Sequence, residues 1–353
     1  MLSFLRAVAR FFRDKIGWNR IGVLLSLAII AVAAVVLFRT LRDTNVNEVI
    51  AALRATEARQ IAFAMLFVAI GYVTLTFYDL FALRTVGHDE IPYRIAALTG
   101  FTSYSVGHNI GASAFTGGAV RYRIYSDYGL TAIDVAKVCF VAGLTFWLGN
   151  AAVLGLGILY VPLAASAIDQ LPFWVNRALA IVILITLACY IGWVSSGPRA
   201  IGKGGWQVQL PGGFSTLLQI CIGIVDLSCC ALAMYMLLPD EPNIGFVYMA
   251  VIFVTATMLG FASHAPGGLG VFDAAMLVAL WQYDKEDLLA GLLLFRLLYY
   301  ILPFVIALAI LGGREFLLSV RGSRGLPTPE KVEASAPLRS EIEVKIDEKT
   351  GAG

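Results

Sequence analysis

The sequence has little charge and few of the residues from which catalytic and metal sites are built. Asp, Glu, Lys and Arg make up 14% of the 353 residues, and there are three histidines. No H-x-x-x-H or E-x-x-H spacing occurs, so we expect no metal and no other cofactor. P-loop, G-x-S-x-G and dinucleotide-binding fingerprints are also missing. A net charge of +2 is too small to indicate a nucleic-acid partner.

The five cysteines all fall inside apolar runs, where a thiol acts as a small hydrophobic group, so we expect no disulfides. Apolar residues, in contrast, are abundant: 59% of the chain is hydrophobic, and the mean hydropathy is +0.80. This composition predicts an all-α, polytopic integral membrane protein. Seven runs reach the roughly 17 to 25 residues that span a bilayer. They are 21–38, 60–83, 132–161, 174–195, 214–238, 244–263 and 288–312.

Composition divides the chain into three parts. Residues 1–20 carry basic residues on an amphipathic pattern without a small-residue cleavage site, which predicts a retained interfacial segment. Residues 21–313 are predicted to form a single transmembrane domain. The charged, proline-containing stretch that follows predicts a disordered cytoplasmic tail over 314–353.

The distribution of positive charge sets the predicted topology. Seven spans would put the two basic ends of the chain on opposite faces, whereas the positive-inside rule places both in the cytoplasm. An eighth crossing is therefore expected, and two glycine-interrupted segments, 96–118 and 264–282, are the candidates. If 96–118 enters the membrane and returns to the same side, and 264–282 crosses it fully, most arginines of the loops lie in the cytoplasm. We expect about eight transmembrane helices, one or two of them re-entrant or broken, and a surface helix in the 39–59 loop.

The segment 96–118 is too polar for a helix that faces lipid. Lipid cannot hydrogen-bond a freed backbone, so the segment must face protein or a water-filled cavity. A turn at the Gly-Gly pair would present N–H groups to an anion, and guanidinium groups that bind phosphate bidentately follow it. The alternatives are a helix interface of small residues and arginines that act only as cytoplasmic anchors. The headgroup-binding candidates are Tyr104, His108, Asn109, Gly117, Gly118, Arg121 and Arg123.

The stretch "SHAPGGLGVFDAA", residues 263–275, interrupts a second apolar run. Pro266 ends the preceding helix, the glycines allow an irregular turn, and a new helix starts at Val271 with free N–H donors. Transporters hold anionic groups at such broken-helix ends, although Asp273 could instead satisfy the helix dipole, or the loop could be a kink without a ligand. The candidates here are His264, Gly267, Gly268, Gly270 and Asp273.

Three ionisable residues, Asp79, Asp226 and Arg296, lie deeper in the predicted spans. A charge at the bilayer centre costs about 2.5 to 3.5 kcal/mol, so each should face protein or water and find a partner. An ion pair between Asp226 and Arg296 is one such arrangement. It would be either structural or part of the movement of a headgroup.

Four segments, in order along the membrane region, carry a resemblance to a known family. They are "YDLFALRTVG" (78–87), "GGAVRYRIYSDYGL" (117–130), "PGGLGVFD" (266–273) and "LLFRLLYYILP" (293–303). Their combination resembles the transmembrane domain of the lysylphosphatidylglycerol synthase, or multiple peptide resistance factor, family and its stand-alone relatives of the YbhN type. Asp273 stands where these relatives typically have glutamate, which keeps a carboxylate but shortens it.

The resemblance implies a multi-pass protein of a bacterial inner membrane, with both termini cytoplasmic and re-entrant helices around a lipid-accessible cavity. It also implies flippase-like movement of aminoacylated or other anionic or zwitterionic phospholipids between leaflets. The partner would be membrane phospholipid, with a separate lipid-modifying enzyme as a second candidate. Full-length synthases add a soluble aminoacyl-transfer domain, for which the 40 residues after Gly313 are too few.

Two other functions stay open. The chain could be a membrane-embedded transferase or an accessory subunit of a lipid- or glycolipid-modifying system, with Asp79, Asp226 or His264 as acid or base. It could also be a scaffold whose cavity is a groove for a partner helix.

Overall fold

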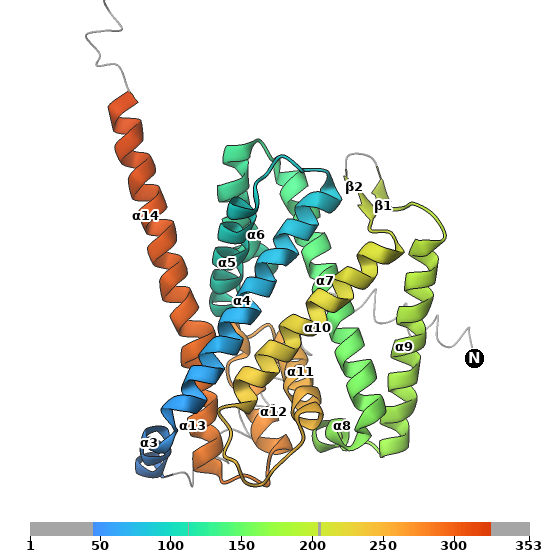
Figure 1. Cartoon of the computed structure of the whole chain (residues 1–353), viewed down its shortest axis with the longest axis vertical. Helices are drawn as coiled ribbons and strands as arrows, with labels where there is room; N and C mark the ends of the chain where they lie inside the picture. The colour runs from blue at the N-terminus through green and yellow to red at the C-terminus, as the bar shows by residue number, and fades with distance from the viewer. Residues whose placement is uncertain (1–44, 112, 204–205, 326–353) are drawn as a thin grey trace, which may run out of the picture. The chain divides into compact units, whose positions relative to one another are not determined.

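A computed structural model describes residues 45–111, 113–203 and 206–325 (Figure 1). The predicted interfacial segment 1–20, the predicted first span 21–38 and the tail beyond 325 lie outside these residues. The chain divides into two compact units, Met1–Leu308 and Ala309–Gly353. The bundle described below belongs to the first unit.

Six helical stretches are long and apolar enough to cross a membrane, and they confirm six of the seven predicted spans. At 29 residues each, the two longest single helices reach about 44 Å, more than the hydrocarbon core of about 30 Å. Five of the stretches are single helices: α4 (Ala58–Val86), α7 (Ala132–Tyr160), α9 (Phe173–Ser195), α10 (Gly213–Tyr235) and α11 (Phe246–Ser263). The sixth, Lys285–Arg314, comprises α13 (Lys285–Phe295), the π-helical η3 (Arg296–Ile301) and the first part of α14 (Leu302–Gly325).

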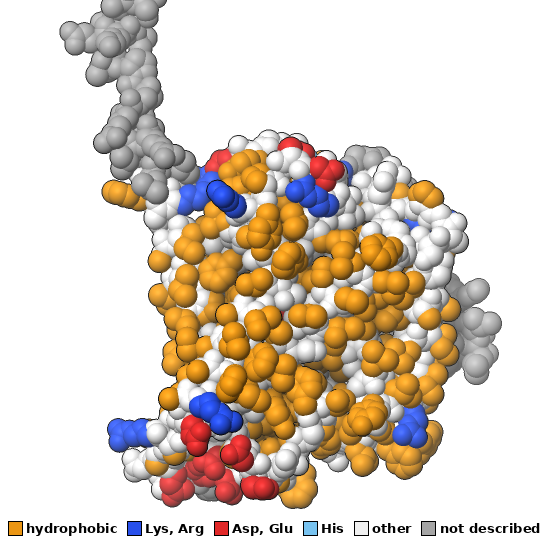
Figure 2. All heavy atoms as spheres, in the orientation of Figure 1, with side chains coloured by type: hydrophobic (Ala, Val, Ile, Leu, Met, Phe, Trp, Pro, Cys, Tyr) orange, Lys and Arg blue, Asp and Glu red, His pale blue; other side chains and the backbone are white. Residues whose placement is uncertain are grey.

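The surface of the bundle is suited to lipid. Figure 2 shows hydrophobic side chains over the middle of one face and charged side chains toward its two ends. Helix α9 illustrates the same point, because Ile181, Val182 and Ile185 in its centre are all exposed. Apolar surface on this scale marks a membrane-embedded protein. The chain is therefore a multi-pass α-helical membrane protein, as its composition predicts.

The first interrupted segment folds as a helical hairpin. Helix α5 (Tyr93–Ile110) ends at Gly111, whose φ of 82° is open to glycine and strained for other residues. Helix α6 (Ser113–Tyr125) packs back against α5. The two helices lie so close that a Cβ atom added at Gly117 would be 3.1 Å from the carbonyl oxygen of Ser103.

The second interrupted segment also folds back, and it does not form the predicted full crossing over 264–282. Helix α12 (Val271–Ala279) has nine residues, or about 14 Å, which is half the thickness of the hydrocarbon core. Helix α12 follows the 3-10 turn η2 (Pro266–Gly268) and packs on α11. The turn itself also approaches α11, since a Cβ added at Gly260 would lie 3.3 Å from the Cα of Gly268. Proline cannot continue α11, and two consecutive glycines with positive φ then reverse the chain.

Two short helices and two short strands lie between the spans. Helix α3 (Val46–Ala55) forms within the 39–59 loop, where a surface helix is predicted; Val46 and Ile50 are exposed, whereas Val49 packs inward. The antiparallel strands β1 (Arg199–Lys203) and β2 (Trp206–Leu210) and the helix α8 (Pro162–Asp169) lie in connections where the sequence predicted only loops.

Helix α14 continues past Gly313 to Gly325, into the region predicted to be a disordered tail. Residues 314–325 contain no proline, and the next proline in the sequence is Pro327. The predicted disordered tail otherwise lies outside the described residues.

Close contact of α7 and α10 generates a prediction. A Cβ added at Gly149 would lie 2.6 Å from the Cα of Gly223, so Gly149→Ala must push the two backbones apart. Overpacking of this kind costs about 1 to 3 kcal/mol. We expect a lower midpoint of thermal unfolding in detergent. Gly143→Ala on the same helix is the control, because an added Cβ there meets no atom within 4 Å. Equal losses for both variants would contradict the contact.

Candidate functional site

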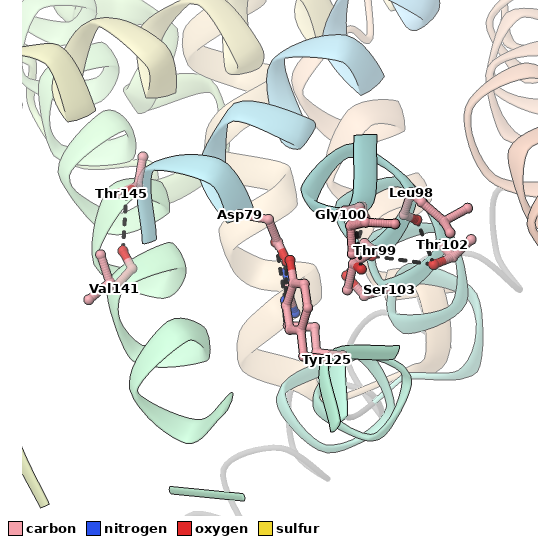
Figure 3. Close-up of polar contacts among 11 residues, drawn as sticks. Asp79, Leu98, Thr99, Gly100, Thr102, Ser103, Tyr125, Val141 and Thr145 are labelled. Atoms are coloured by element: carbon pink, nitrogen blue, oxygen red, sulfur yellow. Dashed lines mark hydrogen bonds and ion pairs between the residues drawn. The ribbon is translucent and has the colours of Figure 1, made fainter. Parts of the chain in front are cut away.

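A buried ion pair joins α4 to α6. Arg121 donates from Nε to both oxygens of Asp79, at 3.1 and 3.0 Å, and from a terminal nitrogen at 2.6 Å. Tyr125 at the end of α6 donates to the same carboxylate at 2.8 Å, and Figure 3 shows Asp79 directed toward this ring. The guanidinium also lies over the ring of Tyr104, 4.7 Å from its centroid. Two of the three guanidinium nitrogens of Arg121 thus bind Asp79, and the face of the group lies against an aromatic ring.

The pair is sealed from its surroundings. The side chain of Asp79 is 0% exposed and that of Arg121 is 6% exposed. Gly100 lets α5 approach, since a Cβ added there would be 3.2 Å from the Cα of Thr76 and 3.5 Å from the Cβ of Asp79. Such a pair holds helices in register, and loss of either partner would leave a buried charge.

This arrangement changes the interpretation of the Gly117–Arg123 region. The turn predicted at Gly117 and Gly118 is not formed, because both residues lie inside α6 and the chain turns at Gly111 instead. Gly117 serves close packing on α5. Arg123 lies on the exposed side of α6, with Asp127 at 3.4 Å, in the divergent orientation expected for residues two apart on a helix.

A second ion pair holds the start of α12. Arg296 donates from Nε to Asp273 at 2.9 Å and from a terminal nitrogen at 2.6 Å, and it also reaches the carbonyl oxygen of Gly267 at 3.3 Å. Asp273 in turn accepts from the backbone N–H of Gly270 at 3.0 Å. The carboxylate thus satisfies the N-terminus of its own helix, which was one of the predicted alternatives.

The predicted pairing of Arg296 with Asp226 is wrong, because Arg296 is committed to Asp273 and Asp226 accepts from the hydroxyl of Tyr78 at 3.0 Å. The two ion pairs also differ in accessibility. The side chains of Arg296 and Asp273 are 14% and 15% exposed, against 6% and 0% in the pair of Arg121 and Asp79.

The turns of the two hairpins meet each other. A Cβ added at Gly111 would lie 3.0 Å from the Cα of Pro266, and one at Gly267 would lie 3.3 Å from the carbonyl oxygen of His108. Asn109 donates to the carbonyl oxygen of Tyr300 at 3.0 Å and so fastens the first turn to η3. We call this contact between residues 108–111 and 266–267 the hairpin junction. The sequence predicted that the interrupted segments face protein or a water-filled cavity, and the structure brings their turns together.

An aromatic cluster surrounds the hairpin junction. His108 stacks on Tyr299, with ring centroids 6.0 Å apart, and also contacts Tyr104 and Tyr300. Tyr72 and Tyr78 from α4 complete the cluster through contacts to Tyr299 and Tyr104. The imidazole Nδ1 of His108 is buried without a hydrogen-bond partner.

The remaining candidates lie at the surface side of the second turn. His264 is exposed, and its ring nitrogen lies 3.0 Å from the carbonyl oxygen of Ala262. Gly268 and Gly270 have positive φ and shape the turn, and Leu269 between them is 58% exposed. Among the residues that the structure describes, no three His, Cys, Asp or Glu side chains are grouped to hold a metal ion.

Sequence reasoning missed the tyrosines. Tyr78, Tyr125, Tyr299 and Tyr300 were part of the quoted motifs but were not assigned to the site. Their signal was present, because a phenol inside an apolar span needs a hydrogen-bond partner and so tends to lie beside a buried polar group.

An apolar surface, six potential spans and ion pairs buried between helices define a polytopic membrane protein with a polar interior. The chain belongs to the family described as the lysylphosphatidylglycerol synthase TM region, which it matches over residues 23–307. It is similar to slr0712 of Synechocystis sp., at 30% identity over 79% of this chain and 86% of the relative. It is also similar to the inner membrane protein YbhN of Escherichia coli, at 29% identity over 68% of this chain and 76% of the relative.

A phosphatidylglycerol lysyltransferase of Staphylococcus aureus is similar over part of its length. Identity is 26% over 88% of this chain, and the match covers 36% of the relative. The chain therefore spans about a third of the length of that relative.

The buried pair predicts a large difference between two neighbouring arginines. Arg121→Gln leaves Asp79 uncompensated, and such a loss costs about 3 to 5 kcal/mol of unfolding free energy. Arg123→Gln breaks a pair in which the arginine side chain is 50% exposed, worth at most about 1 kcal/mol. The measurement is chemical unfolding of the purified protein in detergent. Asp79→Asn combined with Arg121→Gln should recover part of the loss, whereas additive losses would show that the two side chains do not interact.

Proposed function

We propose that the protein handles phospholipid in a bacterial inner membrane and moves a phosphate-bearing headgroup between leaflets at the hairpin junction. The observation that carries the proposal is the meeting of the two broken hairpins beside the partly exposed pair of Arg296 and Asp273. Relatives named as an inner membrane protein and as phosphatidylglycerol lysyltransferases support a role with membrane lipid. The substrate class follows from the phosphate chemistry of a guanidinium group.

Charge supports an orientation for this function. The end of α4, the start of α5 and the β-hairpin lie at one end of the bundle, at the top of Figure 1. Arg84, Arg94 and Arg199 belong to these segments. By the positive-inside rule this end faces the cytoplasm. The α5–α6 hairpin then enters from the cytoplasm, and the α11–α12 hairpin enters from the opposite side. The cytoplasmic location of both termini stays a prediction, because residues 1–44 and 326–353 lie outside the described part of the chain.

Arg296 is better placed than Arg121 to bind a headgroup. The fork of Arg121 is sealed by Asp79, Tyr125 and Tyr104, and its release would leave a carboxylate with no exposed surface. Arg296 and Asp273 both keep exposed surface, and the arginine already contacts the turn through Gly267. A phosphate that replaced the carboxylate on Arg296 would release the second turn from η3.

The transport cycle therefore has a fixed part and a moving part. The sealed pair of Asp79 and Arg121 keeps α4 and α6 together throughout. The pair of Asp273 and Arg296 exchanges partners as the headgroup passes, while acyl chains remain in lipid. A separate lipid-modifying enzyme as partner stays a prediction.

Reconstitution into phosphatidylglycerol vesicles that carry a fluorescent phosphatidylglycerol tests the function. Loss of fluorescence to a membrane-impermeant reductant reports movement from the inner to the outer leaflet. We expect the parent protein to accelerate this loss, and Arg296→Lys to slow it by about tenfold or more. Lysine keeps the charge but loses the bidentate fork, and a charge-assisted hydrogen bond is worth about 1.5 to 3 kcal/mol.

Arg94→Lys is the matched control, because Arg94 is exposed at the start of α5. It should move lipid at the parental rate. Equal rates in parent and protein-free vesicles would overturn the function, whereas equal rates in the parent and Arg296→Lys would overturn only the assignment of Arg296.

A further inference from the structure

Asp226 lies near the middle of α10, the span from Gly213 to Tyr235, and it is 3% exposed. Its oxygen Oδ2 accepts from the hydroxyl of Tyr78 at 3.0 Å. The other oxygen, Oδ1, lies 4.0 Å from the Sγ atom of Cys230. This carboxyl group is therefore buried at membrane depth with a single good hydrogen-bond donor.

The groups that face Asp226 carry no positive charge. They come from α4, α5 and η3 as well as from α10 itself, and they are phenols and thiols. They are Tyr72, Tyr78, Tyr104, Tyr299, Cys229 and Cys230. No Lys, Arg or His of the described residues forms an ion pair with it, whereas Asp79 and Asp273 each hold an arginine fork.

An ionised carboxylate in this position would be costly. Burial of an unpaired charge away from water has a high free-energy cost. Ionisable side chains inside a membrane are therefore paired or neutral. One tyrosine hydroxyl does not compensate a full charge. The packed arrangement therefore favours the neutral carboxylic acid, with its hydrogen on Oδ1, because Oδ2 already accepts from Tyr78.

A proton fits the site better than a metal cation does. Hard cations take six or more oxygen ligands, and the contacts of Asp226 offer only its own carboxyl oxygens and the hydroxyl of Tyr78. A proton needs a single oxygen and no space. The surroundings thus select the smallest cation.

The site is linked to the hairpin junction through η3. Cys230 lies one helical turn after Asp226 in α10, and its Sγ donates to the hydroxyl of Tyr299 at 3.3 Å. The ring of Tyr299 stacks on His108 of the first hairpin. Separation of the two turns would move Tyr299 and open the surroundings of Asp226 to water. Hydration would then allow the carboxyl group to ionise.

We propose that Asp226 is a proton-binding site that is occupied when the hairpins are packed and exchanges its proton when the hairpin junction opens. In the uptake step a hydronium ion gives its proton to the carboxylate, an O–H bond forms on Oδ1, and water is released. In the release step this bond breaks and the proton returns to water. Coupling of this exchange to lipid movement rests on the proposed function, while proton binding itself does not.

Infrared spectroscopy of the full chain in lipid vesicles tests proton binding directly. We expect the parent at neutral pH to show the carbonyl stretch of a protonated carboxylic acid, and Asp226→Asn to lack it. Asparagine keeps the size and the acceptor for Tyr78. Asp240→Asn is the control, because Asp240 is exposed and its removal should leave the band unchanged. If Asp226→Asn fails to fold, Asp226→Glu serves instead and should shift the band. A parent without the band, or a band that either Asp226 variant leaves unchanged, overturns the proposal.

Transport in vesicles with an imposed pH difference tests the coupling. A gradient of about one pH unit should change the parental rate of fluorescent phosphatidylglycerol movement by up to about tenfold, the ratio of proton concentrations. Asp226→Asn should move lipid at the same rate with and without the gradient. Equal responses in the parent and the variant would overturn the coupling. A parent that moves no lipid at all would overturn the proposed function, and the infrared band would still decide whether Asp226 binds a proton.

Discussion

A hydrocarbon environment offers no hydrogen bonds, so each break in a helix at membrane depth must be satisfied within the protein. Each of the two hairpin turns makes backbone hydrogen bonds of its own. Gly268 and Leu269 donate to carbonyl oxygens within the second turn, and Gly111 donates to Gly107 in the first. Asp273 accepts from Gly270. The two turns pack closely where glycine leaves room for backbone against backbone.

The same constraint sorts the three aspartates of the interior by their partners. Asp79 has a sealed arginine, Asp273 shares a partly exposed arginine with the turn, and Asp226 has a phenol and no cation. A sealed pair is costly to break and therefore serves as a fixed strut. A partly exposed pair can exchange one anion for another, and an unpaired acid responds to protons. Three chemically equal side chains thereby acquire three different properties from their surroundings.

The sequence was most informative where composition alone decides. Six spans, the surface helix over 46–55 and the irregular turn at 266–270 followed from apolar length, periodicity and the backbone preferences of proline and glycine. Pairing was harder to predict. Asp226 and Arg296 are both buried and oppositely charged, yet Arg296 pairs with Asp273, because α12 folds back instead of crossing. The sequence pattern does not distinguish a short helix that folds back from a longer helix that spans the membrane, because both would begin after the same Pro-Gly-Gly break.

The π-helical segment η3 explains how one element can serve the hairpin junction and Asp226 together. A π-helical turn displaces carbonyl oxygens from the regular hydrogen-bond ladder, and outside donors must then satisfy them. The carbonyl of Tyr299 accepts from the hydroxyl of Tyr72 at 2.9 Å, and that of Tyr300 accepts from Asn109 at 3.0 Å. Donors on α4 and α5 thus hold η3 in this form, while Arg296 at its start holds the second turn. Movement of the hairpin junction would therefore change the contacts of η3 with α4, with α5 and with the second turn. Such a shared element is what the proposed coupling between a headgroup at Arg296 and a proton at Asp226 requires.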